Sequence, residues 1–337
     1  MATLVVIAMP RTALAAGQTI SVTTSPVSLD LKTKPGTSST SSLQLLNDGT
    51  APLKINMQLD EFNARGENGQ ALIIQPSPND PTASWVSFSP VSFTAQPGVW
   101  TPVKMTINLP KTAQLGYYYA VIFSPDIAST HSNKTVIKGS NGVLVLVDTQ
   151  SANEKRLVNI ANFSVSKKVY EYLPATFNVS IHNSGNIYLA PFGNIYISRN
   201  SAFTSSIAAL DVNTAGGNVL PNSSRNFQAT WSDGFPVFQS KTLDGQVVND
   251  KSGKPIQQLK WNTNHLNKLR FGKYYAKLTL IYNNGKVVIP ITSVVSFWVL
   301  PWKLIAVLIA VILFITILGW FGRKRIRRAF RVLAGKE

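Results

Sequence analysis

Apolar and polar residues alternate in many short runs between residues 18 and 300. Two of these runs are Ile55, Met57, Leu59 and Phe177, Val179, Ile181. Successive side chains of a strand point to opposite faces, so a period of two predicts half-buried β strands. Turn-forming residues separate the runs: Pro35-Gly36, Asn47-Asp48-Gly49, Pro97-Gly98, Asn183-Ser184-Gly185 and Asn283-Asn284-Gly285. The pattern predicts an all-β chain of the sandwich type.

The pattern also repeats along the chain. The run ending at Asn47-Asp48-Gly49 is similar to the run ending at Asn183-Ser184-Gly185, and residues 116–121 are similar to residues 272–277. The separation of the two motifs is about twenty residues longer in the second copy, which predicts an insertion within residues 232–264. We therefore expect two tandem immunoglobulin-like β-sandwiches, residues 17–150 and 155–300, joined by the polar stretch 149–156.

A long apolar run follows the second predicted sandwich. Residues 304–321 hold no charged residue, and eighteen helical residues extend about 27 Å, close to the thickness of a bilayer core. A buried core helix would show polar residues at helical spacing, whereas only Thr316 interrupts this run. The run predicts one transmembrane helix over residues 301–322.

The flanks of this run predict its orientation. Trp302 and Trp320 stand where interfacial aromatic residues belong, and Arg323, Lys324 and Arg325 open a basic segment. The positive-inside rule places residues 323–337 in the cytoplasm as a basic tail and residues 17–300 outside the cell. The tail could instead bind nucleic acid or acidic lipid, but a stop-transfer flank explains its charges without a further partner. We expect a single-pass membrane protein and no nucleic-acid partner.

The first sixteen residues have features of a secretory signal. Residues 1–9 are mostly apolar, and Ala13-Leu14-Ala15 has the small-residue form of a cleavage site. A basic segment does not precede the apolar one, so residues 1–16 resemble a truncated signal peptide. The alternative is an ordinary buried first strand.

Composition excludes several chemistries. Cysteine is absent, so disulfides, thiolate nucleophiles and cysteine-based metal sites are excluded, and the three histidines have no metal-binding spacing. We expect no cofactor. The formal net charge is +17, of which the tail supplies +6, and the rest is thinly spread. This charge suits an anionic cell wall or membrane surface, or it is the ordinary solvated lysine of strand faces.

Motifs of common enzyme classes are missing, which predicts a protein that is not an enzyme. Asp60, Glu61 and Glu67 form an acidic group that could hold calcium, but they lack the spacing of a calcium loop and could equally mark a solvated hairpin tip. A carbohydrate-active subunit that uses Asp60 or Glu61 is a third, remote alternative.

Aromatic residues are the remaining candidates for a binding site. Phe235, Phe238 and Trp261 lie in or beside the predicted insertion, where we expect a polar, glycine-rich loop. Exposed aromatic side chains commonly contact partners, whereas buried ones form the core, and both alternatives stand here.

The chain resembles a known family in residues 25–31, in Pro35-Gly36, and in the strand that ends at Leu46-Asn47-Asp48-Gly49. These features are similar to those of the WxL-interacting surface proteins of Gram-positive bacteria. The resemblance implies a signal peptide, an extracellular domain associated with peptidoglycan, a second immunoglobulin-like domain that binds host or partner proteins, one transmembrane helix and a basic tail.

The leading hypothesis is a non-enzymatic adhesion or scaffolding protein that binds cell-wall polymer, partner surface proteins, or both. The alternative is an extracytoplasmic, chaperone-like assembly factor that lends an edge strand to its clients by β-strand augmentation.

Overall fold

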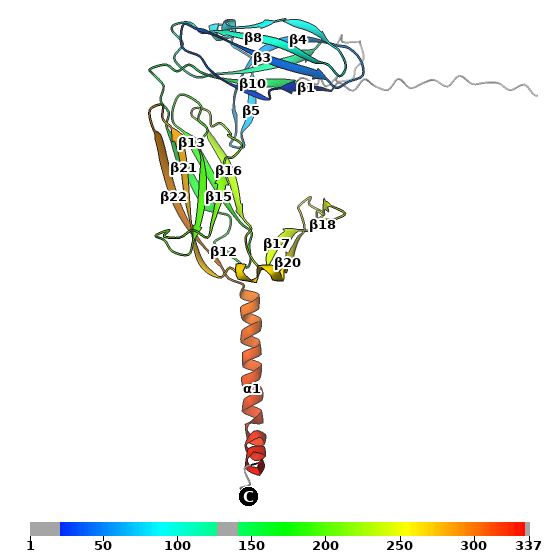
Figure 1. Ribbon diagram of the computed structural model, residues 1–337, viewed down its shortest axis with the longest axis vertical. Helices are drawn as coiled ribbons and strands as arrows, with labels where there is room; N and C mark the ends of the chain where they lie inside the picture. The colour runs from blue at the N-terminus through cyan, green and yellow to red at the C-terminus, as the bar shows by residue number, and fades with distance from the viewer. Residues whose placement is uncertain (1–20, 127–140, 334–337) are drawn as a thin grey trace, which may run out of the picture. The chain divides into compact units, whose positions relative to one another are not determined.

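The structure, a computed structural model, describes the backbone of residues 21–126 and 141–333 and the side chains up to residue 321. The described chain is mostly β strand with one C-terminal apolar helix, as predicted (Figure 1). The predicted signal peptide, residues 1–16, and the side chains of the basic tail lie outside the described part. Contacts divide the chain into two compact units, and the main division falls between Lys155 and Arg156.

The first unit is built of two sheets. One sheet has the strand order β1-β3-β8-β6, and the other has the order β2-β10-β9-β4-β5, with β7 also paired to β4. The strands are β1 (Val22–Ser25), β2 (Ser28–Lys32), β3 (Ser38–Asn47), β4 (Leu53–Arg65), β5 (Gln70–Ile74), β6 (Val86–Ser89), β7 (Ser92–Ala95), β8 (Trp100–Asn108), β9 (Tyr117–Pro125) and β10 (Asn141–Asp148). A short 3-10 helix, Pro81–Trp85, precedes β6.

The core of the first unit follows from the alternation in its sequence. Leu43 and Leu45 of β3 pack in one buried cluster with Val121 and Phe123 of β9, so both sheets turn their apolar face inward. The alternate residues of β3, such as Gln44, are exposed. Burial of apolar side chains between the two sheets is the main favourable term for this unit.

The second unit repeats most of this topology, with one strand fewer in each sheet. One sheet has the order β11-β13-β16 and the other the order β12-β22-β21-β14-β15. The strands are β11 (Val158–Val165), β12 (Val169–Tyr170), β13 (Ala175–Asn183), β14 (Phe192–Ser198), β15 (Ala208–Val212), β16 (Ser224–Trp231), β21 (Gly272–Asn283) and β22 (Val288–Val299). Its own core contains Trp231, Tyr274 and Phe297, whose rings contact one another in edge-on or stacked pairs.

The first strand of each unit is divided between the two sheets. β1 pairs antiparallel with β3, and after Pro26 the chain continues as β2, which pairs parallel with β10 in the other sheet. In the second unit β11 pairs with β13, and β12 then pairs parallel with β22. Proline lacks the N–H that a continuous ladder needs, which explains the switch at Pro26.

The segment predicted as a loop between β16 and β21 contains regular structure instead. β17 (Val237–Ser240) pairs with β20 (Gln257–Lys260), and β18 (Thr242–Leu243) pairs with β19 (Gln246–Val247). A 3-10 helix, Thr263–Lys268, follows β20. The segment is polar in composition, but polar residues can form a strand pair where the side chains are exposed on both sides, as in β18 and β19.

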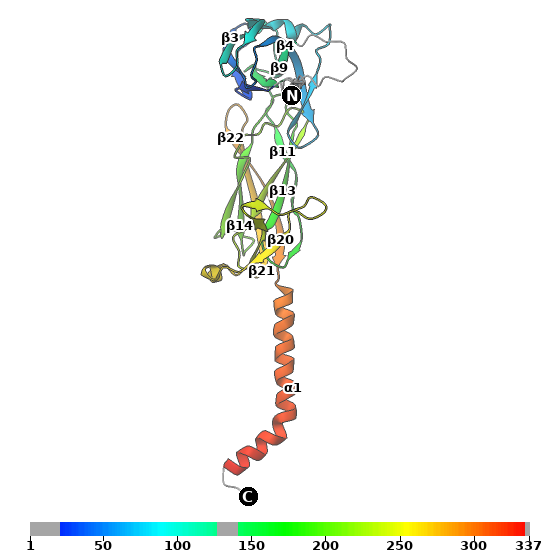
Figure 2. The same cartoon turned by 90° about the vertical axis from the view of Figure 1, so that its right-hand side faces the viewer.

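The C-terminal helix α1 covers Trp302–Leu333 and has 32 residues (Figure 2). The helix extends beyond the predicted membrane span, residues 301–322, into the basic segment. Arginine and lysine favour the helix nearly as well as leucine, and residues 323–333 contain neither glycine nor proline, so the helix continues through the basic segment.

Candidate functional site

The strand β5 forms an outer edge of the first unit. It pairs with β4 in a hairpin, with Phe62 opposite Ile73 and Asn63 opposite Leu72, and no described strand pairs with its other side. Its side chains Leu72, Ile73 and Ile74 are 44%, 43% and 36% exposed. Since neighbouring residues point to opposite faces, the strand is accessible on both faces as well as along its edge.

Two other strands with an open side carry a feature that discourages pairing. β22, which is open beyond its short pairing with β12 at Trp298–Val299, contains Pro290, and the outer strand β15 contains Asp211. Charges and prolines on an edge block the addition of a further strand. β5 contains neither, and among the described strands it alone has three consecutive exposed aliphatic residues.

The three predicted binding aromatics lie at the base of the segment between β16 and β21, and only one of them is largely exposed. Phe235 is buried and contacts Trp261 edge-on at 5.7 Å between ring centroids. Phe238 contacts Tyr172 at 6.0 Å. Trp261 is 54% exposed. Phe235 therefore packs inside, and Trp261 is the exposed member of the group.

An ion-pair cluster fixes this base to the strands beside it. The Asp233 carboxylate forms ion pairs with Lys268, at 2.5 Å between Oδ1 and Nζ, and with Arg270, at 2.8 Å between Oδ2 and Nη2. Desolvation by burial raises the pKa of Asp233, but the hydrogen bonds and charges of Lys268 and Arg270 outweigh it, so the pKa lies below its usual range. Arg270 also lies over the Trp231 ring, 5.5 Å from its centroid.

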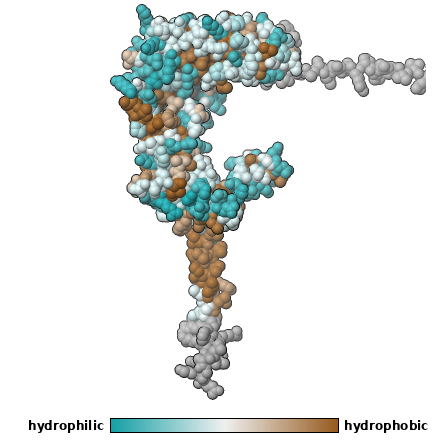
Figure 3. All heavy atoms as spheres, in the orientation of Figure 1, coloured by the Kyte–Doolittle hydropathy of each residue, from teal (hydrophilic) through white to brown (hydrophobic). Residues whose placement is uncertain are grey.

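The flanks of the apolar helix stand where the sequence predicts them. Trp302 is the first residue of α1, and both Trp302 and Trp320 are exposed. Residues 302–321 form a candidate membrane span with a mean hydropathy of 3.0, and none of it is buried against the rest of the described chain. Figure 3 shows this stretch as a continuous hydrophobic surface. The side chains of Arg323, Lys324 and Arg325 are outside the described part.

The acidic residues of the calcium hypothesis do not converge. Asp60 is buried and accepts from Gln58, whereas its neighbour Glu61 points to the other face of β4 and accepts from the Thr82 hydroxyl at 3.3 Å. Burial, and next the charge of Asp80, raise the pKa of Glu61. Over residues 21–126 and 141–333 the structure holds no group of three potential metal ligands.

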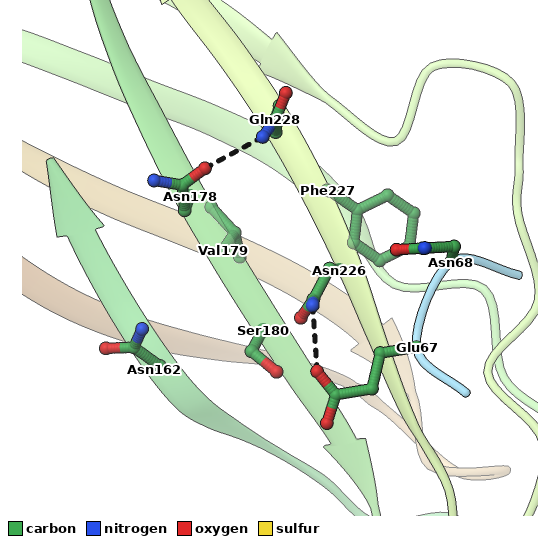
Figure 4. A pocket seen from close by; sticks show the side chains of 9 residues that line it. All are labelled: Glu67, Asn68, Asn162, Asn178, Val179, Ser180, Asn226, Phe227 and Gln228. Carbon is green, nitrogen blue, oxygen red and sulfur yellow. Dashed lines mark hydrogen bonds between the residues drawn. The ribbon is translucent and has the colours of Figure 1, made fainter. Parts of the chain in front are cut away.

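The open face of the sheet β11-β13-β16 is polar. Gln228 donates to the Asn178 side chain at 3.0 Å, as Figure 4 shows, and Asn178 donates to Ser166 at 3.1 Å. Amide and hydroxyl groups paired in this way stabilise neighbouring strands. On the same face the His182 ring nitrogen Nδ1 lies 3.1 Å from the Ser224 hydroxyl, another polar pair across β13 and β16.

Comparisons with known proteins find similar folds but no family. No family model matches the chain, and no curated protein matches it. Among solved structures, a class 5 fimbriae chaperone, CfaA, is 17% identical, with 72% of this chain and 100% of that chain covered and a TM-score of 0.36. The E. coli chaperone DraB is 12% identical, with 83% and 97% covered and a TM-score of 0.33.

A PapD-like domain of human CEP192 is also similar, at 18% identity, with 45% of this chain and 99% of that chain covered and a TM-score of 0.28. Because all of these TM-scores are below 0.5, the likenesses carry no argument about function.

Proposed function

We propose that the chain is a membrane-anchored, extracytoplasmic protein without enzymatic activity that binds an extended segment of a partner surface protein along β5. The observation that carries the proposal is the unpaired, uncharged edge of β5 with its three exposed aliphatic side chains. This is the chaperone-like alternative predicted from the sequence, and the proposal assigns its edge strand to β5.

The physical case rests on what an added strand would gain. Unpaired N–H and C=O groups along an outer strand are a template for another chain, and main-chain hydrogen bonds give such a complex its affinity. Complete burial of a leucine or isoleucine side chain contributes about 1.5–3 kcal/mol, so Leu72, Ile73 and Ile74 would add apolar contacts on both faces. An exposed apolar edge promotes aggregation unless a partner covers it, which also favours a bound partner here.

The anchor is the second part of the proposal. The apolar stretch of α1 is long enough to cross a bilayer, and the basic residues after it favour a cytoplasmic C-terminus. Both units would then be displayed outside the cell, within reach of surface proteins. The cell-wall polymer of the leading hypothesis remains a prediction, because no described feature selects a polymer.

Site-specific photocrosslinking on intact cells tests the β5 edge. A photoreactive residue in place of Leu72 should give a defined adduct that maps to an extended, apolar segment of a surface protein. Val99, which is 52% exposed in a turn of the same unit, is the control position and should give no such adduct.

Ile73→Lys places a charge on the edge and should abolish the Leu72 adduct, while the thermal unfolding of the protein stays unchanged because Ile73 is exposed. Identical adducts from Leu72 and Val99, or an Ile73→Lys variant that still gives the adduct, would overturn the proposal.

A further inference from the structure

We infer that the segment 260–273 is a second membrane contact, which rests on the headgroup layer of an anionic bilayer beside the start of α1. The inference depends on the membrane anchor proposed above. The ligand would be lipid headgroups with acyl chains beneath them. The segment is separate from the β5 edge, which the proposed function assigns to a protein partner.

Strand register places this segment beside the start of the helix. Gly272 pairs with Val299, the last residue of β22, and α1 begins three residues later at Trp302. Phe271 therefore lies next to the point where the chain leaves the sheet for the membrane. Figures 1 and 2 both show the 3-10 helix Thr263–Lys268 at the end of the second unit from which α1 departs.

Further contacts hold both elements to the same short stretch of chain. The Leu300 amide donates to the Tyr170 carbonyl, and Lys303 pairs with Glu171 at 2.9 Å. The Phe238 amide donates to the Leu173 carbonyl, which fixes β17 to the same stretch. Residues 170–173 thus connect the first turn of α1 with the base of the segment between β16 and β21.

The segment has the side chains of an interfacial surface. Its exposed apolar residues are Trp261, Leu266, Leu269 and Phe271. Residues 260–273 also contain four basic residues and no acidic residue: Lys260, Lys268, Arg270 and Lys273. Asp233 neutralises part of the charge of Lys268 and Arg270, whereas Lys260 and Lys273 are exposed. Aromatic rings and lysines are enriched at headgroup level, and basic residues favour anionic lipid.

A membrane is the occupant that fits this surface. The pairing of Gly272 with Val299 brings the apolar residues of this segment close to the exposed Trp302 and to the span that follows it. The excess of positive charge complements an anionic leaflet. The ion pairs of Asp233 fix the segment to the unit, so little conformational freedom is lost when it meets the bilayer.

The absence of cysteine from the chain makes a direct test available. Leu266→Cys in the full chain, labelled with an environment-sensitive fluorophore, is reconstituted into vesicles of phosphatidylcholine and phosphatidylglycerol. Val287→Cys is the matched control, because Leu266 and Val287 are 61% and 60% exposed and Val287 precedes the far end of β22, about 35 Å along the strand from α1. Leu313→Cys, within the span, reports the anchor itself.

We expect the probe at Leu266 to emit at shorter wavelength than the probe at Val287 and to lose intensity when the vesicles contain spin-labelled lipid. Vesicles of phosphatidylcholine alone should reduce both effects. Leu266 and Val287 probes that behave alike while the Leu313 probe is quenched would overturn this inference and leave the anchor intact. A Leu313 probe that is not quenched would overturn the anchor of the proposed function as well.

Equal quenching at Leu266 with and without anionic lipid would show that the segment does not recognise anionic headgroups. Lys260→Gln combined with Lys273→Gln supplies an independent check, since loss of these two exposed charges should weaken the response to anionic lipid and leave the Leu313 signal unchanged.

Discussion

Asn47 and Asn183 occupy equivalent positions at the ends of β3 and β13 and make the same hydrogen bonds. Each is buried, and each side-chain oxygen accepts from the backbone N–H two residues later, Gly49 and Gly185, at 2.9 Å. Each side-chain nitrogen donates to a main-chain carbonyl of another segment. The similarity between the two Asn-x-Gly motifs of the sequence is therefore a shared way to end the strand and turn the chain.

Replacement of either asparagine by aspartate should destabilise its own unit. Asn47 donates to the Ala51 and Ala95 carbonyls at 2.8 and 3.0 Å, and Asn183 donates to the Val219 carbonyl at 2.8 Å. Aspartate keeps the acceptor but turns a second oxygen toward these carbonyls. The loss should be about 1–3 kcal/mol per variant, measured by denaturant unfolding in detergent. Asn162→Asp, at an exposed site, should change stability by no more than about 0.5 kcal/mol.

Protease accessibility on intact cells tests the predicted orientation. A tag inserted near Ser151 should be removed by external protease, and a tag after Glu337 should be protected, because the basic segment favours the cytoplasmic side. Detergent-opened cells, in which both tags should be lost, are the control. Protection of both tags in intact cells would contradict the extracytoplasmic location.

The ion pairs of Asp233 should make the 260–273 segment sensitive to acid. The folded pKa of Asp233 lies below its usual value, so its stabilisation is present above the unfolded pKa and is lost as pH falls through the folded pKa. The carboxylate is partly exposed, so the gain is at most about 1 kcal/mol. Hydrogen exchange of residues 268–271 should accelerate in Asp233→Asn at pH 7. Equal exchange rates in the two proteins would show that the cluster does not hold the segment.

The contribution of Glu61 to stability should have the opposite dependence on pH. Burial and the nearby Asp80 raise its pKa, so the folded protein binds this proton more tightly than the unfolded chain. Its stabilising contribution is present below the unfolded pKa and is lost as pH rises through the folded pKa. Glu61→Gln should therefore be as stable as the parent protein, or more so, at pH 7, and the difference should shrink toward pH 4 in denaturant melts. A variant that loses stability at pH 7 would contradict this interpretation.

In the segment between β16 and β21, the sequence does not predict which aromatic side chains are buried. Its aromatic residues were visible in the sequence, but their burial was not: Phe235 packs against Trp261, and only Trp261 is largely exposed. Local composition cannot tell these two environments apart, because burial depends on which strands come together. The same holds for β5, whose apolar residues are ordinary for a strand until the sheet order shows them at an unpaired edge.

The sequence by itself determined the local features of this protein. Alternation of period two produces strands, Asn-x-Gly places turns, and an uncharged run of eighteen residues produces an apolar helix, since each depends on neighbours a few positions apart. Tertiary structure alone decided the division of β1 and β2 between two sheets, the free edge of β5, and the position of Phe271 beside the start of α1. These features depend on pairings such as Gly272 with Val299, in which the two residues are distant in sequence and many registers satisfy the same hydrophobic pattern.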